Sequence, residues 1–210
     1  MKTDASGDTL WTKTYGRPDN DRDNTIIPTH NGDYLIGATM TSFDPSGRYD
    51  IWLIKIDSLG NTIWARVYGG DGYGWLSSSE SVIESDDNGY IIVGTTTSFG
   101  AGARDIYLIK TDSIGNIQWT KTFGGLEFDD GWLVQQTADG GYIIAGMTNS
   151  FGAGNTDAYL IKTDENGDTI WTRTYGGSDW DDVRTVLQTP CGGIYSLVIP
   201  NHSAMDAMFM

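Results

Sequence analysis

Acidic residues gather in four segments of this chain, each of which follows a Tyr-Gly or Phe-Gly pair. Carboxylates are ligands for Ca²⁺ and accept hydrogen bonds from sugar hydroxyls. Three Ser-Phe segments add rings on which sugars can stack. The candidate ligand-binding residues are Asp19, Asp21, Asp23, Asp71, Glu127, Asp129, Asp130, Asp179, Asp181 and Asp182, with Phe43, Phe99 and Phe151. The alternative interpretation is that the acids are solvated and the phenyl rings fill seams between sheets.

Signals for catalysis or a bound cofactor are weak. His30 and His202 occupy unrelated positions, which predicts neither a zinc site nor a catalytic triad. The single cysteine, Cys191, stands where related segments carry Asp or Asn in a turn. The segment 164–168, DENGD, is faintly similar to a Ca²⁺ loop, but a hairpin turn explains it and its sibling segments equally well. We therefore expect no catalytic residue and no cofactor, with Ca²⁺ as a weak alternative.

These segments belong to a unit that the chain repeats about every fifty residues. A tryptophan recurs at spacings of 53, 55 and 52 residues, at Trp11, Trp64, Trp119 and Trp171. A second landmark recurs at Tyr34, Tyr90 and Tyr142, with Ile194 in the fourth copy. A fixed period of this length is typical of one supersecondary unit repeated along the chain.

The third copy shows which elements the unit contains. Aliphatic and β-branched runs separated by Gly and Asp turns predict strands over 132–137, 142–148, 157–163 and 169–175, which we call strands a to d of the unit. No segment has a sustained helical period, so we expect an all-β protein. Four short antiparallel strands in about fifty residues are typical of a β-propeller blade. Such a blade places the d–a and b–c loops, which carry the acids and phenyl rings, on one side.

The ends of the chain continue this pattern. The last residues, DAMFM, match the beginning of strand c, and KTDASGD near the N-terminus matches the segment between c and d. We therefore expect a single propeller domain over 1–210, in which strand d ends at about residues 16, 69, 124 and 176. Its last blade, 177–210, is completed by 2–16. The ring closes either as a four-bladed monomer or as half of an eight-bladed homodimeric ring.

The pattern Asp-x-x-Gly-x-x-x-Trp precedes the end of strand d in all four copies, beginning at Asp4, Asp57, Asp112 and Asp164. It resembles the tryptophan-docking motif of quinoprotein-type propellers. The whole unit is similar to β-propeller repeats of secreted bacterial and archaeal proteins of unknown function. This resemblance implies that the four tryptophans pack between blades. Redox activity does not follow, because the quinone-dependent enzymes need a vicinal disulfide that a chain with one cysteine cannot form.

Buried charge is expected along strand c. Lys55, Lys110 and Lys162 recur five residues after an aspartate, on the opposite side of the strand. Each lysine is therefore expected to find its partner on a neighbouring strand.

The net charge of −15 disfavours nucleic acid and anionic membranes as partners. No apolar run approaches the length of a membrane span, and the first residues do not match a signal peptide. We expect a non-catalytic binding scaffold with an unknown protein or glycan ligand, extracellular or at the cell surface in its parent protein. The alternatives are a fragment of a larger propeller without activity of its own, or a carboxylate-dependent glycan hydrolase or lyase.

Overall fold

The structure is a computed structural model that describes residues 1–16, 21–41 and 47–200. Within these ranges the regular secondary structure consists of β-strands alone, so the all-β class is confirmed. No helix in the described part of the chain is long and apolar enough to cross a membrane. Asp19, Phe43, His202 and the C-terminal segment DAMFM lie outside the described residues, as do the structural expectations that depend on them.

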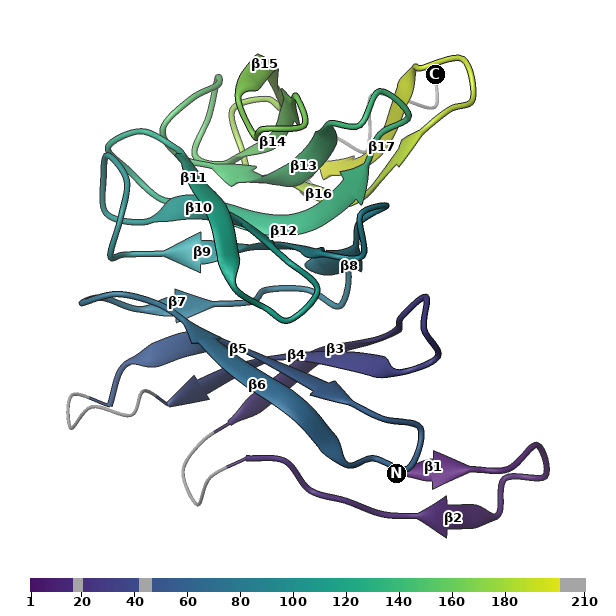
Figure 1. Ribbon diagram of the computed structural model, residues 1–210. Helices are drawn as coiled ribbons and strands as arrows, with labels where there is room; N and C mark the ends of the chain where they lie inside the picture. The colour runs from purple at the N-terminus through teal and green to yellow at the C-terminus, as the bar shows by residue number, and fades with distance from the viewer. Residues whose placement is uncertain (17–20, 42–46, 201–210) are drawn as a thin grey trace.

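The strands form a series of antiparallel sheets that follow one another along the chain (Figure 1). The first four-stranded sheet runs in chain order through β3 (Arg22–Pro28), β4 (Tyr34–Thr41), β5 (Tyr49–Ile56) and β6 (Thr62–Tyr68). The second contains β9 (Tyr90–Thr96), β10 (Asp105–Thr111) and β11 (Ile117–Phe123), with β7 (Gly74–Trp75) and β8 (Val82–Glu84) both paired with β9. The third runs through β12 (Asp129–Gln136), β13 (Tyr142–Thr148), β14 (Asp157–Thr163) and β15 (Thr169–Tyr175).

Two-stranded sheets stand at the two ends of this series. At one end β1 (Lys2–Thr3) pairs with β2 (Thr9–Trp11), and at the other β16 (Asp181–Gln188) pairs with β17 (Ile194–Pro200). Figure 1 shows the β1–β2 hairpin and the β16–β17 hairpin at opposite ends of the stack, with the three larger sheets between them.

The expected strands match the observed ones closely in the third unit. Those over 142–148, 157–163 and 169–175 are β13, β14 and β15. Strand a begins three residues earlier than expected, because Asp129 and Asp130 pair with the end of β13. In the second unit strand a is split into β7 and β8. The hydroxyl of Ser81 donates to the carbonyl oxygen of Ser78 there, at 2.6 Å, and such local bonds compete with the strand ladder.

The core lies between successive sheets. Residues of β13 and β14, such as Ile143 and Leu160, are fully or almost fully buried against Val183 and Val186 of β16. An equivalent cluster joins β9 and β10 to β12, β13 and β14. The inner strands are therefore covered on both faces, which explains why they read as continuous apolar runs rather than as alternating ones.

Each unit also contains a turn that the Asp-x-x-Gly pattern builds. In the β10–β11 turn, Asp112 Oδ1 accepts hydrogen bonds from the backbone N–H groups of Ile114 and Asn116. Gly115 follows with a φ of 80°, which favours glycine because a side chain strains this left-handed backbone conformation. Hydrogen bonding to Asn116 lowers the pKa of the exposed Asp112 carboxyl. These aspartates therefore shape hairpin turns.

The repeated tryptophans lie where one sheet meets the Asp-x-x-Gly turn of the next. Trp64 of β6 lies against Gly115 and tilts against Tyr90 of β9, with ring centroids 5.8 Å apart. Trp119 repeats this arrangement with Gly167 and Tyr142, and Trp11 approaches Gly60. All four indoles, including that of Trp171, are only partly buried.

A tyrosine strengthens two of these seams. The hydroxyl of Tyr68 donates to the carbonyl oxygen of Gly115 at 2.8 Å, and the hydroxyl of Tyr15 donates to that of Gly60 at the same distance. Burial raises the pKa of the Tyr68 phenol, so the hydroxyl stays protonated and remains a donor. In the next seam the residue at this position is Phe123, which has no hydroxyl.

The strand c lysines have partners in the turn between strands a and b. Lys110 Nζ lies 2.6 Å from Asp87 Oδ1 and 2.7 Å from Ser85 Oγ, and Lys162 Nζ lies 3.0 Å from Asp139. Lys55 Nζ lies 3.9 Å from Asp33 Oδ2 of its own a–b turn and also donates to the hydroxyl of Tyr90 at 3.0 Å. The expected partner therefore comes from a turn or from the next sheet, because the lysine reaches past the neighbouring strand.

Candidate functional site

The loops between strands d and a and between strands b and c meet on one side of the stack, which we call the loop side. The backbone of Ala103 donates to the carbonyl oxygen of Leu126, and that of Asp129 donates to the carbonyl oxygen of Arg104. The next sheet repeats the arrangement, since the backbone of Asp181 donates to the carbonyl oxygen of Thr156. The two kinds of loop are therefore held together by main-chain hydrogen bonds.

Three of the candidate acids are buried beneath this side. Asp129 Oδ2 accepts hydrogen bonds from the backbone of Gly125 at 2.8 Å and from the hydroxyl of Ser150 at 2.6 Å. Asp181 Oδ2 accepts an equivalent bond from the backbone of Gly177 at 2.7 Å. The third buried candidate acid is Asp130. These carboxylates hold the loops in place and do not reach solvent.

Glycine makes room for the buried carboxylates. A Cβ atom on Gly124 would collide with the carboxylates of both Asp105 and Asp129. Asp105 Oδ2 accepts from the backbone of Ala101 and Gly102, each at 3.2 Å. The Gly-Gly pair that ends strand d therefore serves the seam between two sheets, where two carboxylates approach the same backbone.

The remaining candidate acids lie nearer the surface. Asp71, Glu127 and Asp179 are exposed, whereas Asp21 and Asp182 are partly buried. Asp23 belongs to β3, and its side chain is outside the described part of the structure.

The two described phenylalanines of the b–c loops lie half in a seam and half in solvent. The rings of Phe99 and Tyr107 have centroids 5.4 Å apart, and those of Phe151 and Tyr159 are 5.6 Å apart. The far edge of Phe99 also approaches Gly70 of the neighbouring d–a loop. Each ring thus packs at a seam and also presents an edge to the loop side.

A further set of aromatic residues was missed by the sequence analysis. Tyr73, Phe128 and Trp180 are all exposed, and each stands four residues after the first glycine of the Gly-Gly pair. Their constant distance from that pair is the signal that identifies them. Tyr73 also approaches Tyr49, with ring centroids 6.1 Å apart.

Arg104 links two of these aromatic positions. Its guanidinium carbon lies 4.4 Å from the ring centroid of Phe128 and 5.8 Å from that of Trp75, within the range of a cation–π contact. Its Nη2 atom lies 2.8 Å from Asp130 Oδ2. Burial raises the pKa of the Asp130 carboxyl, and the Arg104 charge opposes that rise.

A hollow of about 480 Å³ lies beside this cluster. Its lining residues are Arg22, Thr39, Tyr49, Trp75, Leu76 and Ser77. This volume is within the range of small-molecule sites in proteins. Aromatic surfaces, a guanidinium and hydroxyl groups together provide stacking and hydrogen bonding. We call Tyr49, Tyr73, Trp75, Arg104 and Phe128 the aromatic strip.

Metal-binding geometry is absent from the described part of the chain, where no three carboxylate, imidazole or thiol side chains are grouped as ligands. In the segment 164–168, Asp164 Oδ1 instead accepts from the backbone of Asn166 and Asp168. His30 is exposed, and its Nδ1 lies 3.5 Å from Glu84 Oε2. Cys191 is exposed in the β16–β17 turn, where a contact with the Thr189 hydroxyl lowers the pKa of its thiol.

No family model matches the chain. The chain is similar to the regulatory protein FlaEY of Caulobacter vibrioides, with 24% identity over 146 aligned residues. The match covers 58% of this chain and only 15% of that protein. The fold and the repeats define the class as an all-β repeat protein.

Proposed function

We propose that the chain is a non-catalytic binding scaffold of the β-propeller type, whose ligand is a carbohydrate held by the aromatic strip. The observation that carries the ligand class is the hollow in which Tyr49 and Trp75 stand beside Arg22. Aromatic faces stack on the apolar faces of sugar rings, while the Arg22 guanidinium supplies donors to ring substituents.

The propeller interpretation is supported by strand order and by the stacking of the sheets. Consecutive strands pair antiparallel within each large sheet, and successive sheets pack face to face. The same sequence unit produces each of these sheets, and the d–a and b–c loops gather on one side. A propeller has these features. Its docking tryptophans correspond to Trp11, Trp64, Trp119 and Trp171.

A binding role fits the placement of the acids better than a catalytic one does. A glycan hydrolase needs two carboxyl groups that reach the same bond of the substrate. Asp105 and Asp129 approach one another at Gly124, but both are buried and held by loop hydrogen bonds. A hydrolase or lyase therefore has less support.

A second interpretation is that this chain is one part of a larger propeller. It is favoured by the match to FlaEY, which covers only 15% of that protein. In that case the aromatic strip would still bind its ligand, since its residues come from the first two large sheets and from the loops that follow them. An extracellular or cell-surface position of the parent protein remains part of this proposal.

A glycan array, probed with and without Ca²⁺, tests the ligand class. We expect binding to a subset of glycans that Tyr49→Ala and Phe128→Ala each weaken at least about tenfold, as expected when one stacking contact is lost. The matched control is Leu59→Ala, because Leu59 is exposed in the β5–β6 turn at the opposite side of the sheet.

Thermal melting of each variant separates loss of binding from loss of fold. Failure of the wild-type protein to bind any glycan would refute the carbohydrate assignment. Equal binding by the strip variants and the control would refute the location. Binding only in the presence of Ca²⁺ would require a cation ligand set that the described carboxylates do not form.

A further inference from the structure

Two exposed apolar faces stand at opposite ends of the stack. The head face is the side of the β3–β6 sheet that is turned toward the β1–β2 hairpin. Ile26 is exposed on it, whereas Ile36 on the same side is buried against Trp11 and Tyr15. The tail face is the outer side of β16–β17 and carries Leu187, Tyr195, Leu197 and Ile199. Because three large sheets separate the two ends, the faces of one molecule do not meet in this structure (Figure 1).

The same register positions are buried wherever a neighbouring sheet is present. Tyr195 and Leu197 are 71% and 54% exposed, whereas Ile143 and Ala145, their counterparts in β13, are both at 0%. Ile26, in β3, is 61% exposed. Its counterparts, Val134 in β12 and Val186 in β16, are at 5% and 7%. The head and tail faces are therefore the two halves of a seam that the stack builds repeatedly.

The repeated tryptophans show the same difference between the interior and the ends of the stack. Trp11, Trp64 and Trp119 each approach the glycine of the next Asp-x-x-Gly turn. These three contacts use the turns of Gly60, Gly115 and Gly167, so the Asp-x-x-Gly turn left for Trp171 is that of Gly7. No heavy atom of the described residues lies within 4 Å of a Cβ placed on Gly7, although its φ of 90° is of the same kind.

We propose that the tail face of one copy of this chain packs on the head face of a second copy, and that Trp171 of the first meets the Gly7 turn of the second. Two such contacts, each head to tail, close a two-copy ring. The interface is heterologous, because each copy contributes a different surface at each contact. It is independent of whatever the aromatic strip binds.

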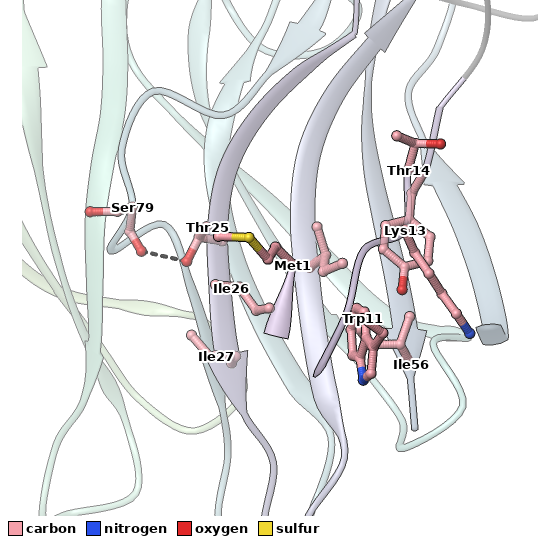
Figure 2. A pocket seen from close by; sticks show the side chains of 11 residues that line it. Met1, Trp11, Lys13, Thr14, Thr25, Ile26, Ile27, Ile56 and Ser79 are labelled. Carbon is pink, nitrogen blue, oxygen red and sulfur yellow. Dashed lines mark hydrogen bonds between the residues drawn. The ribbon is translucent and has the colours of Figure 1, made fainter. Parts of the chain in front are cut away.

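A hollow of about 650 Å³ at the head face provides the space for this contact. Figure 2 shows Trp11 of β2 on one side of it and Ile26 and Ile27 of β3 on the other. Met1, Tyr15, Ile36 and Ile56 add further apolar surface to its wall, and the polar lining residues are Lys13, Thr14, Thr25 and Ser79. Apolar side chains such as Tyr195 and Leu197 of a partner would fill it, as the equivalent side chains fill the internal seams.

Sedimentation equilibrium with designed variants tests the pairing. One chain has a mass of 22.9 kDa, and we expect the wild-type protein to sediment at twice that value. Ile26→Asp on the head face and Leu197→Asp on the tail face each place an unpaired charge in the contact. Each is expected to raise the dissociation constant by about 100-fold or more. Leu126→Asp is the control, since Leu126 is exposed on a loop away from both faces.

Mixing the two variants gives a result that only a head-to-tail contact predicts. Ile26→Asp retains an intact tail, and Leu197→Asp retains an intact head, so the mixture can form one unaltered contact. We expect each variant alone to be a monomer and the equimolar mixture to regain the dimer mass.

Gly7→Ala adds a second, independent measurement. The methyl group meets no described residue of its own chain, but it would meet Trp171 of the second copy. We expect this change to weaken the dimer, whereas Gly32→Ala, which has a similar φ and equally open surroundings, leaves it intact. Circular dichroism confirms that each variant is folded.

Three outcomes would overturn the proposal. A wild-type mass of one chain at all concentrations would mean that the faces are covered within one molecule or by another partner. Persistence of the dimer in Ile26→Asp and Leu197→Asp would place the contact elsewhere. Failure of the mixture to regain the dimer mass would exclude head-to-tail pairing.

Discussion

Gly115→Ala tests how the sheets of this protein are joined. Gly115 lies in the β10–β11 turn, with a φ of 80°. A Cβ there would be 3.0 Å from Trp64 Cζ3 and 2.8 Å from Arg66 Cγ, both on β6 of the preceding sheet. The substitution therefore disturbs the seam between two sheets as well as its own turn. Gly32→Ala is the matched control, because its φ is 84° and no heavy atom lies within 4 Å of its Cβ position.

The expected loss of stability has two separable parts. A non-glycine residue in the left-handed region costs about 1–2 kcal/mol, and both variants carry this cost. Forcing the indole of Trp64 to move adds about 1–3 kcal/mol, which is typical of overpacking. The hydrogen bond from Tyr68 to the Gly115 carbonyl oxygen would also weaken. We expect Gly115→Ala to lower the free energy of unfolding by about 1–3 kcal/mol more than Gly32→Ala does.

Urea unfolding followed by tryptophan fluorescence and by circular dichroism measures this difference. Coincident transitions in the two signals establish two-state behaviour, which a free-energy comparison requires. The slope against urea should be equal in the two variants. If both lose the same stability, the glycine is needed only for its turn, and the docking of Trp64 on this position contributes nothing measurable to the seam.

Three further substitutions test the remaining contacts. Phe123→Tyr should restore a hydroxyl donor toward the Gly167 carbonyl oxygen and stabilise the protein by about 0.5–1 kcal/mol in urea unfolding. Asp129→Ala removes the acceptor of two loop hydrogen bonds and should cost about 2–3 kcal/mol, against under about 0.5 for exposed Asp179→Ala. Hydrogen bonds from Thr137 and Lys162 lower the pKa of Asp139 to about 2 from its ordinary 3.8. The stability that ionised Asp139 contributes is therefore complete above about pH 4 and is lost as the pH falls through 2. Asp139→Asn should therefore make the urea midpoint of unfolding depend less on pH between these values. The Asp139 assignment would be contradicted if the urea midpoint depended on pH equally in the wild-type protein and in Asp139→Asn. The Asp129 assignment would be contradicted if Asp129→Ala and Asp179→Ala lost the same stability.

Sequence patterns predicted the strands well where the determining interactions are local. The strand at 142–148 is bounded by an Asp-Gly turn and a Gly-rich loop, and its apolar run needs no information from distant residues. The split of strand a into β7 and β8 was missed, because a run of serines satisfies its own backbone there. Each serine is ordinary in isolation, and only the competition with β9 decides the outcome.

The candidate site was predicted less completely. The loop side was located correctly as the region where acids and aromatic rings gather, but acids such as Asp129 and Asp130 are buried. An aspartate beside a Gly-Gly pair can hold a loop or face solvent, and the choice depends on donors such as Ser150 from another loop. Phe128 was not predicted as a site residue, because the group that contacts its ring, the guanidinium of Arg104, is distant in the sequence.

The repeating unit, the all-β class and the turns follow from the amino-acid sequence alone, because strand and turn formation depends on residues close together in the chain. The tertiary structure decided which members of each repeat are covered. Ile143 and Tyr195 hold the same position in their repeats, yet one is buried and the other exposed, because in the part of the chain that the structure describes a sheet lies over the first and none over the second. Whether a residue is buried depends on the sheet that packs against it, and that sheet comes from a different repeat.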